Sequence, residues 1–168
     1  MAVLPILKWP DARLSTRCDP VAAGEDVSTL VADMLDTMYH AQGRGLAASQ
    51  VGVMKRVFVM DCSWKEGSPS PMVMINPTVM AAERVPVTAD EGCLSIPGVM
   101  VPVTRNTAVT LQWTAAEGDI HMADFDGFEA RCIQHEFDHL NGVVTFDRID
   151  AETRATLEGA YLTAEQGA

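Results

Sequence analysis

Two histidines four residues apart, with a glutamate directly after the first, are the side chains best suited to chemistry in this sequence. The segment reads Gln134-His135-Glu136-Phe137-Asp138-His139-Leu140. On a helix, residues i and i+4 share a face, so His135 and His139 can bind one metal ion. Glu136 adds a carboxylate that can hold and deprotonate a water molecule beside that ion. The H-E-x-x-H pattern therefore predicts a catalytic metal site, whereas the histidine spacing alone also fits two surface histidines.

A catalytic metal usually has three protein ligands, so a third ligand must come from another part of the chain. No histidine follows His139, and the acids after it lie at a turn or on a terminal helix pattern: Asp147, Asp150, Glu152 and Glu158. Upstream, Cys93 lies in residues 90–98, which we interpret as a loop bounded by glycine and proline. A thiolate is a good ligand for zinc or ferrous iron, which favours Cys93. A zinc endopeptidase with a downstream third ligand is the alternative.

The metal-binding segment requires a helix, and its flanks and apolar spacing predict one. Asp126 and Glu129 are typical of a helix start, and Asn141-Gly142 is typical of a stop. Apolar side chains recur at core spacing in between, at Ala130, Ile133, Phe137 and Leu140. Cys132 is expected to be a buried small apolar residue like Cys18 and Cys62, and its place one turn before His135 gives the alternative that it lines the site. Asp138 is expected to orient a ligand or to pair with Arg105 or Arg131.

The remaining elements predict an α+β fold. Residues 4–8 are expected to form an extended arm, and a helix begins near Asp26, with Met34 and Met38 as core residues. Short strands are expected at 57–61, 72–75, 85–88, 99–104, 108–113 and 120–123. A terminal helix over 150–161 and a frayed tail over 163–168 complete the chain. We expect antiparallel sheets packed around the metal-binding helix, with an N-terminal and a C-terminal helix, because no βαβ repeat occurs.

Three motifs resemble those of the peptide deformylases. Gly43-Arg44-Gly45-Leu46-Ala47-Ala48-Ser49-Gln50 is similar to G-x-G-L-A-A-x-Q, Glu91-Gly92-Cys93-Leu94-Ser95 to E-G-C-L-S, and Gln134 to His139 to Q-H-E-x-D-H. They occur in the family's order, and the resemblance runs from about Leu4 to the terminal helix. A dinucleotide-binding interpretation of the first motif fails, since a helix and not a strand is expected before it.

The resemblance implies a reaction and a role for each site residue. Cys93, His135 and His139 would bind one divalent metal, Fe²⁺ in the cell, with Zn²⁺, Ni²⁺ or Co²⁺ possible in preparations. Glu136 would act as general base and then acid when the metal-bound water attacks the formyl group of a nascent formyl-Met peptide. The Gln50 amide and the Leu94 N–H would stabilise the oxyanion. Gly45 would let the substrate backbone approach.

One segment departs from the family pattern. Many members have an arginine or another polar residue shortly after E-G-C-L-S, whereas this chain has the uncharged run Gly98-Val99-Met100-Val101. Arg44 is the candidate to replace that contact with the peptide. A deformylase-like protein with weak or altered substrate use, or one retained only for binding, is a further alternative.

Composition sets the general class. At 168 residues with 48% apolar residues, the chain is expected to be one domain, 1–168, and not disordered. A net charge of -11 argues against strong binding to nucleic acid or anionic membranes, so any contact with the ribosome would be transient or local. Four scattered cysteines make a disulfide framework improbable, and the first ten residues lack a signal-peptide pattern. We therefore expect a cytoplasmic protein with no membrane span.

Overall fold

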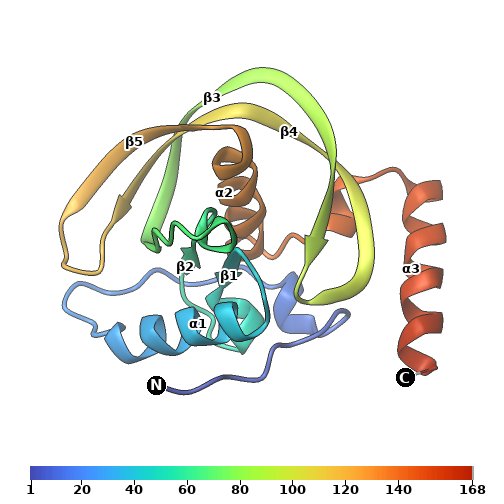
Figure 1. Ribbon diagram of the computed structural model, residues 1–168, viewed down its shortest axis with the longest axis horizontal. Helices are drawn as coiled ribbons and strands as arrows, with labels where there is room; N and C mark the ends of the chain where they lie inside the picture. Colours follow the sequence, from blue (N-terminus) through green and yellow to red (C-terminus); the bar gives the residue numbers. More distant parts are fainter. Residues whose placement is uncertain (168) are drawn as a thin grey trace.

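The computed structural model describes residues 1–167 as one antiparallel sheet with three α-helices (Figure 1). The strands, in sheet order, are β1 (Gly45–Ala47), β2 (Val57–Met60), β3 (Met72–Cys93), β4 (Ile96–Thr114) and β5 (Ile120–Asp126). The helices are α1 (Ser28–His40), α2 (Gly127–Leu140) and α3 (Ala151–Gln166). Short 3₁₀ turns cover Ala12–Ser15, Ala48–Val51, Trp64–Glu66 and Thr145–Arg148. The predicted α+β class with an early and a late helix is confirmed.

The start of the sheet lies between two helices. Side chains alternate between the faces of a strand, and β2 shows this clearly. Val57 and Val59 pack with α1, whereas Phe58 and Met60 pack with α2. The predicted core residues Met34 and Met38 of α1 are fully buried. Figure 1 shows β3, β4 and β5 arching over α2, with α1 on the other side of β1 and β2.

Helix α2 has two buried stripes. Ala130, Ile133 and Leu140 are fully buried in the core, as their spacing predicts, whereas Phe137 is only partly buried. The second stripe carries His135, Glu136 and His139, which are also buried. Asp126 precedes the helix in extended conformation, but its side chain makes no capping hydrogen bond. The helix therefore depends on apolar packing for its position, and it turns its polar stripe toward the hairpin of β3 and β4.

Three predictions about the strands were wrong in detail. Residues 72–75 and 85–88 belong to one strand, β3, which passes Pro77 and Pro86 through irregularities in its register with β4. Residues 99–104 and 108–113 likewise form one strand, β4. Cys93 does not lie in a loop: it ends β3 opposite Ile96, and the two residues between them make the turn.

The N-terminal arm and helix α3 both pack at the turn between β3 and β4. The arm over residues 4–8 is extended, and hydrogen bonds fix it from Leu7 N to Gln50 O (2.7 Å) and from Trp9 N to Ser95 O (2.9 Å). Helix α3 continues to Gln166, so the frayed tail predicted from Thr163 is helical up to that residue, and Ala168 lies outside the described residues. Across residues 1–167, no helix is both long and apolar enough to cross a membrane.

Candidate metal centre and active site

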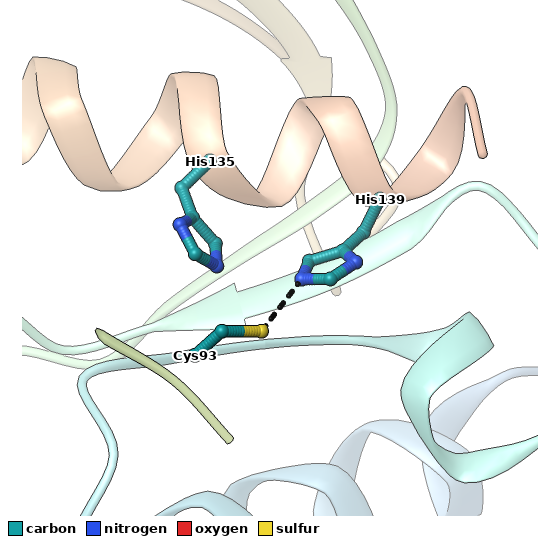
Figure 2. Close-up of side chains that lie close together, drawn as sticks. All are labelled: Cys93, His135 and His139. Atoms are coloured by element: carbon teal, nitrogen blue, oxygen red, sulfur yellow. Dashed lines mark hydrogen bonds between the residues drawn. The ribbon is translucent and has the colours of Figure 1, made fainter. Parts of the chain in front are cut away.

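The three predicted metal ligands converge from two elements (Figure 2). Helix α2 places His135 and His139 one turn apart, and their ring centroids are 5.1 Å from each other. The end of β3 brings Cys93 beneath them, with its Sγ 3.4 Å from His139 Nε2. One potential ligand atom from each residue lies within 4.8 Å of the others. Residues 46 positions apart in the chain thus form one compact cluster.

This cluster fits a single metal ion. Zinc holds thiolate sulfur and imidazole nitrogen at about 2.0–2.3 Å, so two ligands of one tetrahedral ion lie roughly 3.3–3.8 Å apart. The distance between Cys93 Sγ and His139 Nε2 falls in that range. Burial lowers the pKa of His139 well below its usual range, which keeps the ring neutral and able to bind a cation. One thiolate and two imidazoles suit a divalent transition metal.

Three of the four downstream acids have other partners, and the fourth, Glu152, is exposed in the first turn of α3. Asp147 and Glu158 both pair with Arg154, and Asp150 accepts the Thr153 N–H as the cap of α3. Cys93 is the residue that completes the cluster with the two histidines. This arrangement argues against the endopeptidase alternative, which requires a third ligand after His139.

The candidate ligand His135 is oriented by a carboxylate that the sequence analysis did not single out. Its Nδ1–H donates to Glu91 Oε1 over 2.8 Å, which leaves Nε2 free to face the metal. Glu91 also accepts two hydrogen bonds of 3.0 Å from Arg105 and one of 2.6 Å from Arg131. Burial opposes the charge on Glu91, but the bonds from His135 and Arg105 prevail and lower its pKa to about 2. The place of Glu91 two residues before Cys93 was the available signal.

Asp138 extends the same buried network. Its carboxylate lies 2.6 Å from Arg105 Nη1, which confirms the predicted pairing with Arg105. The alternative partner, Arg131, pairs with Glu91 instead. Arg148, from the 3₁₀ turn after α2, also binds Asp138. Arg105 thus joins the end of β3 to α2 through two carboxylates.

Glu136 lies buried on the same helix as the candidate ligands His135 and His139, and one of its carboxylate oxygens has no hydrogen-bond partner within the described residues. It is 4% exposed, and within the described chain its Oε2 has no hydrogen-bond partner. Burial raises the pKa of Glu136 to about 7, so this carboxyl can gain or lose a proton near neutrality. A Cβ on Gly45 would lie 2.6 Å from Glu136 Oε1 and 3.0 Å from Cys132 Sγ. The glycine therefore provides the space that the glutamate needs.

Gln50 and Leu94 lie next to Cys93. Gln50 is 1% exposed, and its Oε1 accepts the Ala47 N–H over 2.9 Å. That bond turns Nε2 toward the site, where it donates to Ser95 Oγ over 3.1 Å and lies 3.8 Å from Cys93 Sγ. Leu94 begins the turn after Cys93, and its side chain packs closely against Gly43.

A cavity of about 1040 Å³ opens onto this cluster. All predicted site residues except His139 line it, and Cys132 is both buried, as expected by default, and part of the lining, as in the alternative. The apolar run contributes Gly98, Val99 and Met100, and the Met100 side chain is 56% exposed. Arg44 also lines the cavity, but its guanidinium pairs with Glu66 over 2.7 Å and donates to the Cys62 carbonyl. Arg44 is thus held by the protein at the cavity wall.

Comparison with known proteins identifies the family. The polypeptide deformylase family model matches residues 3–155. Peptide deformylase 2 of Xanthomonas campestris is 47% identical over 151 residues, which cover 88% of this chain and 87% of that protein. The peptide deformylase of Chromohalobacter salexigens is 48% identical over 150 residues, or 88% and 86% of the two chains.

Solved structures agree with the sequence comparisons. The crystal structure of a peptide deformylase from Legionella pneumophila matches with a TM-score of 0.91 at 34% identity, covering 98% of this chain and 96% of that one. The enzyme from Ehrlichia chaffeensis in complex with actinonin matches with a TM-score of 0.88 at 37% identity, covering 97% and 98%. The family match spans nearly the whole chain and includes the motifs that build the site. This chain therefore belongs to the polypeptide deformylase family.

Proposed function

We propose that the protein removes the formyl group from the N-terminal formylmethionine of nascent polypeptides in a metal-dependent hydrolysis. The observation that supports this most strongly is the buried Glu136, which lines the cavity together with Cys93 and His135 and, within residues 1–167, has one carboxylate oxygen without a hydrogen-bond partner. The relatives are named peptide deformylases, and the Ehrlichia enzyme was crystallised with actinonin in complex. The small formyl carbonyl is a suitable target for a water activated at the base of this cavity.

Each site residue has one task in the proposed reaction. Cys93, His135 and His139 would hold a divalent ion, which would supply polarisation of the carbonyl and a lowered pKa for the attacking water. Glu136 takes the proton of the attacking water and then delivers it to the methionine nitrogen that leaves. Gln50 Nε2 and the Leu94 N–H, both next to Cys93, donate hydrogen bonds to the oxygen that gains negative charge.

The wall of the cavity recognises the methionine and the peptide that follows it. Gly45 lets the substrate backbone approach, and the neighbouring Arg44 lines the same side of the cavity. The aliphatic surface from Val99 and Met100 suits an apolar side chain, and burying that side chain contributes ~1.5–3 kcal/mol. We propose ferrous iron as the ion in the cell, because the donor set accepts iron, zinc, cobalt or nickel and the family resemblance implies iron.

The same proposal gives a cellular setting. The substrate emerges during translation in the cytoplasm, where a reducing environment protects the four free thiols. Any contact with the ribosome is transient, because the net charge of -11 gives no general attraction to RNA.

Formate release from formyl-Met-Ala-Ala tests this function. We expect rapid release by the metal-loaded protein, no reaction with acetyl-Met-Ala-Ala, and no cleavage of an internally quenched peptide without a formyl group. Cleavage of the quenched peptide without formate release would support the endopeptidase alternative. A metal-loaded protein that binds formyl-Met-Ala-Ala but leaves it intact would show a binding protein with a deformylase fold.

A further inference from the structure

The mouth of the catalytic cavity has a charge opposite to that of the whole chain. The sequence contains 23 acidic residues and 12 arginine and lysine residues. Its lysines are Lys8, Lys55 and Lys65, and two of these, Lys8 and Lys65, line the cavity. Two of the three lysines of this acidic protein therefore line the proposed substrate cavity.

These two ammonium groups are not neutralised by the protein. Among the ion pairs of residues 1–167, Lys55 binds Glu25, but neither Lys8 nor Lys65 takes part in a pair. Both lysines are exposed, and the Lys65 ammonium lies over the Trp64 ring, 5.5 Å from its centroid. Their charges are therefore available to a molecule that enters the cavity.

The other charged groups of the mouth largely cancel one another. Arg44 is paired with Glu66, and Arg131 is paired with Glu91. Asp90 is the exposed carboxylate of the lining, whereas Glu91 and Glu136 are buried in the site. Two free ammonium groups thus face one free carboxylate, and the mouth is locally positive.

Hydrogen bonds of neighbouring residues anchor both lysines to segments of the chain that line the cavity. Lys8 lies between Leu7 and Trp9, whose N–H groups donate to Gln50 O and Ser95 O. Lys65 follows Trp64, whose indole N–H donates to Gly43 O over 2.8 Å. Lys8 is therefore anchored to the segments that carry Gln50 and Ser95. Lys65 is anchored to the segment that contains Gly43 and Gly45.

We infer that Lys8 and Lys65 determine substrate specificity by favouring formyl-Met peptides with an acidic residue soon after the methionine. This inference rests on the proposed function, because the formyl group must reach the metal for the peptide to extend past the lysines. A lysine in the peptide is disfavoured for the same reason. Each exposed pair changes the specificity constant by only ~2- to 5-fold, because water screens it.

Steady-state kinetics with charge-matched peptides test this inference on the metal-loaded protein. The substrates are formyl-Met-Glu-Ala, formyl-Met-Gln-Ala and formyl-Met-Lys-Ala, with a second set that carries the charge at the third residue. We expect kcat/KM to fall in the order Glu, Gln, Lys, chiefly through KM. The differences should largely vanish in ~1 M salt, where the screening length is only about 3 Å.

Lysine variants test whether Lys8 and Lys65 cause the preference for acidic peptides. Lys8→Gln and Lys65→Gln should each reduce the ratio of kcat/KM between the Glu and Lys peptides, and the double variant should bring it close to one. Lys55→Gln is the matched control, because Lys55 pairs with Glu25 and does not line the cavity. This control should keep the ratio of the parent.

The outcomes separate this inference from the proposed function. Turnover of all peptides with equal kcat/KM, or a preference that persists in the double variant, overturns the inference and leaves the deformylase function intact. Failure of the metal-loaded parent to hydrolyse any of the peptides refutes the proposed function, and the inference with it.

Discussion

At the scale of single residues, Glu136 is the group whose chemistry can be separated from metal binding. Glu136→Gln preserves shape but removes the proton acceptor, and no metal ligand is lost. We expect normal metal content with kcat reduced ~10²- to 10⁴-fold, as for other general acid-base groups. Elemental analysis and formate release on the same sample measure both quantities.

Glu129→Gln is the matched control, since Glu129 is exposed in the first turn of the same helix. It should retain both metal and turnover. A Glu136→Gln enzyme with the kcat of the parent would show that the metal alone activates the water.

Gly45 tests whether the position of Glu136 matters as much as its charge. In Gly45→Ala the new methyl group would lie 2.6 Å from Glu136 Oε1, so the carboxylate must move. A shift of about 1 Å in a catalytic group can reduce the rate ~10²-fold, and we expect a loss of that order in kcat. Metal content should remain unchanged, because the three atoms nearest to the added Cβ belong to Glu136 and Cys132 and not to a candidate ligand.

The control for this substitution is Gly159→Ala on α3, where an added Cβ meets nothing within 4 Å. It should leave kcat unchanged and stabilise the helix by ~0.5–1 kcal/mol. Unchanged kcat in Gly45→Ala as well would contradict the role assigned to the glycine.

The sequence predicts residues well where spacing along one element decides their position. His135, Glu136 and His139 share a helix, so a local period of 3.6 residues places them together. Glu91 was missed because its partners Arg105 and Arg131 approach it only through strand pairing and the packing of α2. Local spacing contains no information on those contacts.

At the scale of elements, Arg105 connects the β3–β4 hairpin to α2. Its side chain is 4% exposed and binds both Glu91 and Asp138. Removing one member of a buried ion pair leaves a buried charge without its partner, at a cost of ~3–5 kcal/mol. We therefore expect Arg105→Leu to lower the free energy of unfolding by about that amount, measured by urea denaturation of the metal-loaded protein.

Arg13→Leu removes an arginine from a solvent-exposed pair with Asp11 and serves as the control. Its effect on the unfolding midpoint should be small, because water screens such pairs. Equal midpoints for the two variants would show that the Arg105 network does not stabilise the fold.

The sequence predicted the helices better than the strands. Residues 72–75 and 85–88 were predicted as two separate strands, but register shifts in the β3–β4 ladder let one strand continue past Pro77 and Pro86. The strand β1 has only three residues, too few for an alternating pattern. Strand β1 is recognised only by its antiparallel pairing with β2. A pattern within a few consecutive residues does not reveal that pairing.

At the scale of the whole molecule, one aromatic cluster joins the two ends of the chain. Tyr161 is 1% exposed, lies against Trp9 and Phe146, and donates to Trp9 O over 2.9 Å. It is the buried residue of α3. Tyr161→Ala should therefore cost ~3–5 kcal/mol of unfolding free energy, as for other large aromatic deletions.

Leu162→Ala is the neighbouring control, because Leu162 is 42% exposed. It should change the unfolding free energy by no more than ~0.5 kcal/mol. An equally small loss in Tyr161→Ala would show that α3 does not contribute to the stability of the domain. The sequence indicated α3 but not its partner, because Trp9 and Tyr161 are 152 positions apart.

The metal content of Cys93→Ser tests the central claim most directly. We predict that the parent binds one divalent ion per chain and that Cys93→Ser, which loses the thiolate between the two histidines, binds far less under the same loading. Cys18→Ser, which changes a buried cysteine outside the cluster, should bind as much as the parent. Full occupancy in Cys93→Ser, together with loss of metal in Asp147→Asn or Glu158→Gln, would contradict the assignment and move the third ligand downstream.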